Sequence, residues 1–263
     1  MQAIATNIRK NILHIANLAG SPHIGSALSC ADILTALYFD ILNLEDYDNR
    51  DLFILSKAHS AMALYATLYE KGLLTKEEME GYYQNGGSLP AHTDRFTNPY
   101  IEISAGSLGH GLPMAVGMAH ALKLKKSNRK VFVLMGDGES QEGSVWEAAM
   151  LAPKLELNNL TVLIDRNNLQ GYGRADELLS YEPIDKKFEA FNWEVLRING
   201  HNANAIKDAT NMKTNKPKMI ICDTIKGKGV SFMEDQLIWH YYIVTDEIKQ
   251  KAIVELEESL HEK

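Results

Sequence analysis

Hydrophobic positions along the chain follow two different periods. Near the start, Ile4, Ile8, Ile12 and Ile15 recur at the spacing of an amphipathic helix, and Gly20 follows where that helix would end. Elsewhere apolar residues form short continuous runs rich in β-branched side chains, which is typical of strands buried on both faces. These patterns predict strands over 51–56, 131–136, 160–166, 193–198 and 217–225. They predict further helices over 29–42, 57–72, 75–83, 112–126, 144–155, 184–191, 203–212 and 246–260.

The order of these segments predicts the fold class. Strands alternate with helices, which implies an α/β fold with a parallel sheet covered by helices on both faces. The sequence shows no internal repeat, low-complexity tract or Pro/Ser-rich linker, so we expect one domain over residues 1–263. The segment 85–106 is rich in Gly, Pro and Asn, and a long ordered loop of this kind is often functional.

Composition narrows the class of protein. A net charge of −7 argues against nucleic acid or an anionic membrane as the main partner. The two cysteines, Cys30 and Cys222, lack metal-ligand spacing and are interpreted as free thiols in a reducing compartment. No apolar run reaches the length of a membrane span, and the amphipathic N-terminus does not resemble a signal peptide. We therefore expect a cytoplasmic protein.

Polar side chains end two neighbouring strands of the predicted sheet. Asp137 follows the strand 131–136 between two glycines, and Asn167 follows the next strand 30 residues later (167 − 137), about one βαβ unit. Ligands of such sheets bind beyond the carboxyl ends of the strands, and oxygen ligands suit Mg²⁺. A backbone carbonyl just past Asn167 could add a third ligand, and Gly136 and Gly138 would let the backbone approach an anion. The alternative is that both polar segments are ordinary turns.

The stretch GDGESQEGSVWEAAMLAPKLELNNLTVLIDRNN resembles the thiamine-diphosphate signature, which starts at Gly-Asp-Gly and ends about thirty residues later in Asn. Other blocks resemble transketolase and keep its order: SPHIGSALSCADIL, LSKAHSAMALYATL, LPAHTD, GSLGHGLPMAVGMA and KGKGVSFMEDQLIWH. The resemblance covers nearly the whole chain but only the first part of a full transketolase. It implies a three-layer αβα thiamine-diphosphate-binding fold, without the pyrimidine-binding and C-terminal domains. The chain therefore resembles the N-terminal subunit of a split transketolase.

This resemblance implies a metal site and a diphosphate site. Asp137, Asn167 and the carbonyl of Leu169 would bind Mg²⁺, or Ca²⁺ or Mn²⁺ in its place. Gly138 would donate its N–H to the diphosphate of thiamine diphosphate, and Asn167 would also contact the cofactor.

Four histidines fall where the family places its active-site histidines. The resemblance assigns His59 and His240 to the diphosphate and substrate region. It assigns His23 and His92 to the ketose hydroxyls and the oxygen of the intermediate. Imidazole suits these tasks because it can donate, accept or carry charge near neutral pH. A single histidine would more often be structural, but four in four separate blocks favour the functional interpretation.

Four further positions match the family and also have simpler explanations. Gly106 and Leu108 match positions that line the pyrimidine and thiazolium rings, and equally fit a helix-entry glycine and a core leucine. Glu142 and Glu147 match carboxylates at the subunit interface that link two active sites through protons. The alternative is that they are acids that favour the first turn of a helix, and the match with the family favours the functional interpretation more for Glu142 than for Glu147.

The chain also departs from the family pattern. His110 stands where Gln is common, and would add an ionisable group near the cofactor. Tyr241, followed by Tyr242, replaces the usual Gly after Trp-His and changes the expected substrate wall. Pro22 and Ile24 flank His23 where Gly and Pro are usual.

The family activates the cofactor with a Glu in the pyrimidine-binding domain of the opposing subunit, and no acid of this chain matches it. We therefore expect the chain to be active only with a C-terminal partner subunit, in an α2β2 heterotetramer. The reaction would transfer a two-carbon ketol unit from a ketose or ketose phosphate to an aldose or aldose phosphate. Alternatives are a 2-oxo acid dehydrogenase component, a deoxyxylulose-phosphate synthase, or a non-catalytic assembly subunit. The blocks GSLGHG and KGKGVSFMED favour transketolase over the other enzymes, and retention of the metal ligands and four histidines argues against a scaffold.

Overall fold

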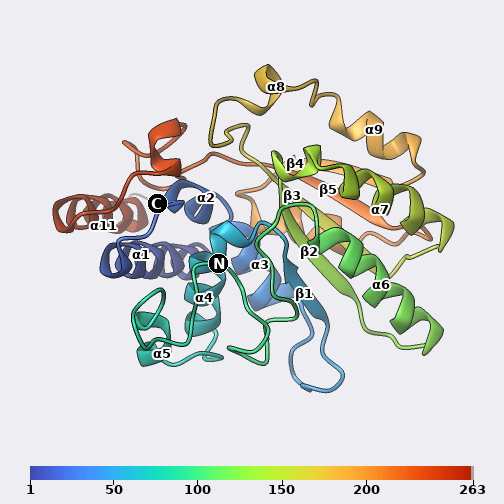
Figure 1. The fold of residues 1–263 in the computed structure, drawn as a ribbon, viewed down its shortest axis with the longest axis horizontal. Helices are drawn as coiled ribbons and strands as arrows, with labels where there is room; N and C mark the ends of the chain where they lie inside the picture. Colours follow the sequence, from blue (N-terminus) through green and yellow to red (C-terminus); the bar gives the residue numbers. More distant parts are fainter. Residues whose placement is uncertain (262–263) are drawn as a thin grey trace.

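A parallel sheet passes through the centre of the computed structural model, which describes residues 1–261 (Figure 1). Its strands have the order β1-β2-β3-β5-β4, and every neighbouring pair is parallel. The strands are β1 (Leu52–Leu55), β2 (Val131–Gly136), β3 (Leu160–Arg166), β4 (Glu194–Asn199) and β5 (Lys218–Asp223). Each lies within or one residue from its predicted segment, so the predicted α/β class is confirmed.

Helices cover both faces of the sheet. One face carries α1 (Gln2–Ala19), α2 (Ile24–Ser29), α3 (Ala31–Ala36), α4 (Ala61–Glu70), α5 (Lys76–Glu80), α10 (Ala203–Asn211) and α11 (Asp246–His261). The other carries α6 (Gly111–Leu124), α7 (Gly143–Lys154), α8 (Ala175–Leu178) and α9 (Ile184–Ala190). Figure 1 shows the first and last helices, α1 and α11, side by side although they lie far apart in the sequence. None of the described helices combines the length and apolar character that a membrane span requires.

Successive residues of the central strands point into two different cores. In β2, Phe132 and Leu134 pack with α1 and its neighbours, whereas Val131, Val133 and Met135 pack with α6 and α7. All five are at most 2% exposed. Burial on both faces explains why this strand is a continuous apolar run rather than an alternating one.

Helix ends follow the local signals of the sequence. Gly20 ends α1 in the left-handed conformation, with φ of 57°. Thr75 and Glu78 form the predicted capping box at α5: the Thr75 hydroxyl accepts from Glu78 N–H at 3.2 Å and the Glu78 carboxylate accepts from Thr75 N–H at 2.8 Å.

The segment 29–42 differs from the prediction of one helix capped by Ser29. Helix starts already at Ile24, breaks at Cys30 and ends in a π-helical turn, Leu37–Ile41. Ser29 therefore closes α2 instead of capping α3, and its hydroxyl donates to Asp165 Oδ2 at 2.5 Å. This contact with β3 is tertiary, which is why the local sequence did not reveal it.

Candidate functional site

A cavity of about 530 Å³ lies at the carboxyl ends of β2 and β3. Here it is called the site cavity. Its lining includes all eleven residues predicted to act in catalysis, cofactor binding or metal binding: His23, His59, His92, Gly106, Leu108, Asp137, Gly138, Glu142, Asn167, Leu169 and His240. They come from seven separate stretches of the chain, which the parallel topology brings to one edge of the sheet.

The two polar strand ends meet in this cavity. The Asp137 carboxylate is buried, with Oδ1 accepting from Gly138 N–H at 2.7 Å and Oδ2 from Asn168 N–H at 2.5 Å. Asn167 Oδ1 accepts from Leu169 N–H at 3.1 Å. Because a carboxylate offers about four lone-pair directions, these bonds leave Asp137 able to bind a cation.

Electrostatics at Asp137 favour a positive ligand. Burial, followed by the neighbouring Asp165 carboxylate, raises the pKa of Asp137. A cation beside Asp137 would offset both effects, because it stabilises the ionised form that burial disfavours.

Three histidines of the cavity lining, His23, His59 and His240, form a cluster. The His23 ring centroid lies 5.4 Å from that of His59 and 4.8 Å from that of His240, both in edge-on geometry. Burial and then His92 lower the pKa of His23 to about 4, and burial and then Lys226 lower the pKa of His240 to about 3. The pKa of His59 is also lowered, mainly by burial. The lowered pKa values favour the neutral form of the three rings at pH 7, which can donate and accept hydrogen bonds.

Lys226 joins the histidine cluster to the strand ends that carry the predicted metal ligands Asp137, Asn167 and Leu169, here called the metal edge. Its ammonium donates to the carbonyl of Leu169 at 2.7 Å and lies 2.9 Å from His240 Nδ1. Burial and then the charge of Lys57 lower the pKa of Lys226 to about 8. The sequence patterns did not single out Lys226 as a site residue, although it stands in the KGKG segment that resembles the family.

Comparisons with known proteins place the chain in a family. A family model described as transketolase, thiamine diphosphate binding domain, matches residues 1–253. The chain belongs to the transketolase family. It is 42% identical to one chain of the apulose-4-phosphate transketolase of Phocaeicola vulgatus, over 96% of this chain and 92% of that one. It is 38% identical to a 6-deoxy-6-sulfo-D-fructose transketolase subunit from Clostridium sp., over 98% of this chain and 96% of that one. The crystal structure of Campylobacter jejuni transketolase matches with a TM-score of 0.91 and 31% identity, covering 97% of this chain but 42% of that one.

The site cavity of this transketolase-family chain fits the cofactor of the family. Asp137, Asn167 and the Leu169 carbonyl supply three oxygen atoms, the ligand type that Mg²⁺ and Ca²⁺ prefer. Among the described residues, two buried nitrogen atoms of the cavity lining have no hydrogen-bond partner: His23 Nδ1 and Gln170 Nε2. A polar ligand in the cavity would satisfy such atoms, which are costly when left unpaired.

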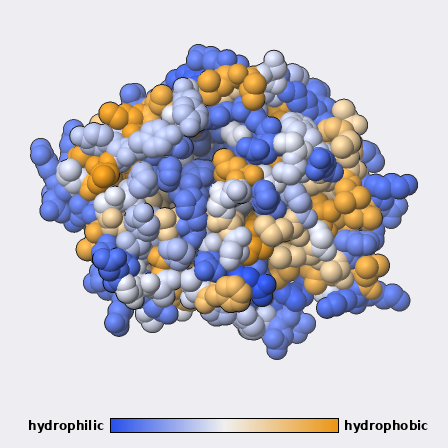
Figure 2. Space-filling model, viewed as in Figure 1, coloured by the Kyte–Doolittle hydropathy of each residue, from blue (hydrophilic) through white to orange (hydrophobic). Residues whose placement is uncertain are grey.

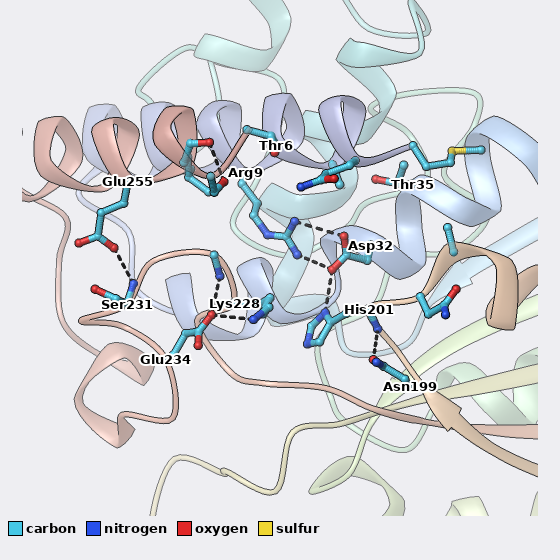
Figure 3. A pocket seen from close by; sticks show the side chains of 18 of the residues that line it. Thr6, Arg9, Asp32, Thr35, Asn199, His201, Lys228, Ser231, Glu234 and Glu255 are labelled. Carbon is cyan, nitrogen blue, oxygen red and sulfur yellow. Dashed lines mark hydrogen bonds and ion pairs between the residues drawn. The ribbon is translucent and has the colours of Figure 1, made fainter. Parts of the chain in front are cut away.

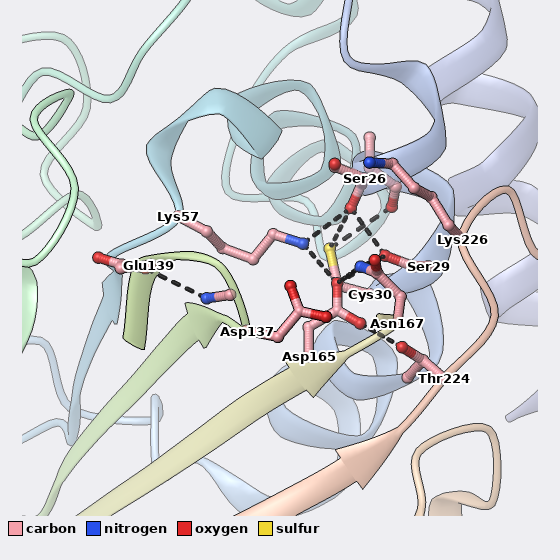
Figure 4. Close-up of polar contacts among 12 residues, drawn as sticks. Ser26, Ser29, Cys30, Lys57, Asp137, Glu139, Asp165, Asn167, Thr224 and Lys226 are labelled. Carbon is pink, nitrogen blue, oxygen red and sulfur yellow. Dashed lines mark hydrogen bonds and ion pairs between the residues drawn. The ribbon is translucent and has the colours of Figure 1, made fainter. Parts of the chain in front are cut away.

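A buried ion pair lies beneath the metal edge (Figure 4). The Lys57 ammonium contacts the Asp165 carboxylate, and the two side chains are 1% and 0% exposed. Burial alone would raise the pKa of Asp165, but Lys57 together with hydrogen bonds from Lys57, Ser29 and Thr224 outweighs burial and lowers it. Asp165 also accepts from Asn167 Nδ2 at 3.4 Å, so the pair helps to orient a predicted metal ligand.

Glu139 links the loop GSLGHG, residues 106–111, to the end of β2. One carboxylate oxygen accepts from Gly109 N–H at 3.0 Å and from the Ser56 hydroxyl, and the other accepts from Gly136 N–H at 3.1 Å. Burial raises the pKa of Glu139, and these three donors oppose that shift. Glu139 thus fixes the loop that carries Gly106 and Leu108 into the cavity.

Tyrosines form the rim of the cavity. The Tyr241 ring lies 4.6 Å from that of His240, centroid to centroid, and a Cβ on Gly171 would fall 2.5 Å from the Tyr241 hydroxyl. Tyr241 and Tyr172 are 55% and 85% exposed, so the wall is open to a partner or substrate. The departure from glycine at position 241 therefore changes the entrance of the cavity.

Two of the considered residues lie outside this lining. Glu147 is exposed on α7, and His110 is exposed at the start of α6. His110 follows Gly109 in the chain, but it is not part of the cavity lining. Its predicted position near the cofactor stays a prediction.

Proposed function

We propose that this chain is the diphosphate-binding subunit of a two-chain transketolase. The complex transfers a two-carbon ketol unit from a ketose phosphate to an aldose phosphate. The observation that carries the proposal is the gathering of all eleven family-matched residues around one cavity at the sheet edge. Sequence identity of 42% to a protein named as one subunit of a transketolase, over 92% of that protein, supports it.

In this proposal the metal edge holds Mg²⁺ and the diphosphate. Asp137, Asn167 and the Leu169 carbonyl would hold the ion, and the Gly138 N–H, which donates to Asp137 at 2.7 Å, would donate to the diphosphate. The buried Lys57 and Lys226 add positive charge on the same side. Bound thiamine diphosphate supplies the electron sink for the two-carbon unit.

The histidines of the cavity would contact the sugar. His23 and His92 donate to and accept from the ketose hydroxyls, and His240 reaches the reacting end from beside Lys226. Lowered pKa values keep His23 and His240 uncharged, so each can donate one hydrogen bond and accept another at neutral pH.

The proposed partner subunit supplies what this chain lacks, above all the carboxylate that activates the cofactor. Glu142 lies at the rim of the cavity and Glu147 is exposed on α7, which begins at the next residue after Glu142. Figure 2 shows apolar residues gathered over α6 and α7, where Leu124, Met150 and Leu151 are 70%, 54% and 48% exposed. This face fits the contact between two copies of the chain in an α2β2 complex, with Glu142 and Glu147 near that contact.

The substrate class follows from the names of the relatives. One is named for apulose 4-phosphate and the other for 6-deoxy-6-sulfo-D-fructose, so both names refer to sugars that carry an anionic group. We infer a ketose with a phosphate or sulfonate at its far end. The open tyrosine rim leaves that end to the partner subunit.

The test is reconstitution. The purified chain should bind Mg²⁺ and thiamine diphosphate weakly and be inactive, and addition of the partner subunit should restore ketol transfer from xylulose 5-phosphate or a related ketose. Asp137→Ala should abolish cofactor-dependent activity of the complex while circular dichroism shows an intact fold. Full activity of the isolated chain, or wild-type turnover of Asp137→Ala, would refute the proposal. A complex that assembles without binding the cofactor would identify a scaffold instead.

A further inference from the structure

A buried polar network outside the site cavity ends on the loop that carries Lys226. We propose that Arg9, Asp32 and His201 form a positioning device that fixes the backbone of residues 224–230, here called the Lys226 loop, and thereby places the Lys226 ammonium in the site. The importance of Lys226 for the cofactor rests on the proposed function, whereas the support of the loop does not.

Three elements distant in sequence supply the network (Figure 3). Arg9 of α1 donates two hydrogen bonds to Asp32 of α3, at 3.2 Å to Oδ1 and 2.6 Å to Oδ2. His201, between β4 and α10, places Nδ1 2.7 Å from Asp32 Oδ2. The side chains are only 7%, 16% and 14% exposed, so these bonds form in a weakly screened environment.

The hydrogen bonds define the tautomer of His201. The Ile225 N–H donates to His201 Nε2 at 2.9 Å, so Nε2 carries the lone pair and Nδ1 carries the proton that is donated to Asp32. Burial alone would raise the pKa of Asp32, but the hydrogen bond from His201 and the charge and hydrogen bond of Arg9 outweigh it and lower the pKa. Ionised Asp32 therefore holds His201 in the orientation that receives the loop.

The loop has little freedom once Ile225 is held. Lys226 is the next residue, and its carbonyl accepts from Asp235 N–H at 2.9 Å. Gly227 N–H donates to Gly25 O at 3.0 Å. At Gly227, φ is 80° and a Cβ would lie 2.2 Å from Met233 O, so only glycine allows this close approach. Anchors on both sides of Lys226 thus fix the start of the side chain that reaches Leu169 and His240.

Solvent reaches the network through a cleft other than the site cavity. A cleft of about 880 Å³ is lined by Arg9, Asp32, His201, Lys228 and Glu234, among other residues. Lys228 donates to Glu234 at 2.9 Å, so the charged groups facing His201 are two ion-paired cations and two carboxylates.

The first test measures the loop without cofactor. In His201→Ala, deuterium exchange followed by mass spectrometry should rise in a peptide covering the Lys226 loop and stay unchanged in β2 and β3. In His201→Gln, the side-chain oxygen can accept from Ile225 and the amide can donate to Asp32, so exchange should return part of the way to wild type. His14→Ala is the matched control, because His14 also bonds a carboxylate, that of Glu80 at 2.8 Å, but joins α1 to α5 and not to the loop.

The second test measures thiamine diphosphate binding with Mg²⁺ in the complex with the partner subunit. His201→Ala should weaken it about tenfold or more, the range found for residues that orient ligands indirectly. If wild type binds no cofactor, the proposed function fails while the exchange experiment still decides on the positioning device. If His201→Ala does not fold, His201→Gln decides: its loop exchange should lie above that of wild type, because a glutamine amide reproduces the two hydrogen bonds of His201 only in part. Unchanged loop exchange in these experiments, or a rise spread over the whole protein, would overturn the inference.

Discussion

Replacement of Asp165 by alanine should destabilise the protein by about 3–5 kcal/mol, because it leaves a lysine charge buried without its partner. The Lys57 and Asp165 side chains are 1% and 0% exposed, so water cannot take the place of the carboxylate. Lys57 would retain only the Ser26 carbonyl, at 3.1 Å. The hydroxyls of Ser29 and Thr224 would lose their acceptor as well.

The size of this effect distinguishes a buried pair from a surface pair. Lys186 and Glu189 also form an ion pair, at 2.8 Å, but their side chains are 65% and 44% exposed. Glu189→Ala should therefore change the free energy of unfolding by less than about 0.5 kcal/mol. It is the matched control for a loss of one carboxylate.

Urea unfolding at pH 7, followed by circular dichroism, measures both changes from the midpoint and slope of the transition. The double variant Lys57→Met/Asp165→Asn removes both charges and keeps an acceptor for the hydroxyls. It should recover more than half of the loss, because the penalty comes from the unpaired charge. An Asp165→Ala protein within about 1 kcal/mol of wild type would refute the reasoning.

The dependence of the unfolding free energy on acid pH gives a second test of Asp165. The pKa of Asp165 is lower in the folded protein than its unfolded value of about 3.9, so its contribution is present above that pH. The contribution is lost as pH falls toward the folded value. Unfolding free energy of wild type should therefore drop below about pH 4, and the drop should be smaller in Asp165→Ala.

Three further outcomes follow from the site. Gly111→Ala should lower the unfolding free energy by about 1–3 kcal/mol. The added Cβ would lie 2.2 Å from Ser56 Oγ and 2.9 Å from Ser56 Cα, so the backbone would have to move. An unchanged urea midpoint would contradict this. The Mg²⁺ affinity measured by calorimetry should weaken as pH falls, because the metal binds only the ionised carboxylate of Asp137. The weakening should begin above the pH range in which an ordinary aspartate titrates, since the pKa of Asp137 is raised. A pH-independent affinity would argue against Asp137 as ligand. Tyr241→Gly should leave stability nearly unchanged, since Tyr241 is 55% exposed. It should alter the ratio of kcat/KM values between two ketoses. The same ratio in wild type and variant would exclude Tyr241 from the substrate wall.

The sequence predicted the cavity because its main determinants are local. Asp137 and Asn167 each follow a buried strand, and parallel strands place such ends at one edge whatever the rest of the fold does. The histidines came instead from a resemblance to transketolase. Nothing in the spacing of His23 and His240, more than two hundred residues apart, indicates that their rings lie 4.8 Å from each other.

The buried charges could not be predicted in the same way. Lys57, Asp165 and Lys226 look like surface residues, since lysine and aspartate are rarely buried unless paired. Asp165 also interrupts an apolar strand, VLIDR, and the pairing that explains it comes from a lysine 108 residues earlier in the chain. Helix α2 was missed because all six of its residues are buried, so no polar face marks a helical period.

One carbonyl group connects the metal edge, Lys226 and the network that supports the Lys226 loop. The Leu169 oxygen receives the Lys226 ammonium at 2.7 Å and is also the third predicted metal ligand. A carbonyl oxygen has two lone pairs, so it can bind the ion and keep Lys226 at the same time. Lys226 in turn is held through Ile225 by His201, on the far side of the loop. Metal binding and order in the Lys226 loop should therefore be coupled. Mg²⁺ with thiamine diphosphate should slow amide exchange in residues 224–230. By reciprocity, opening of the loop should weaken cofactor binding by the factor by which the cofactor disfavours that opening.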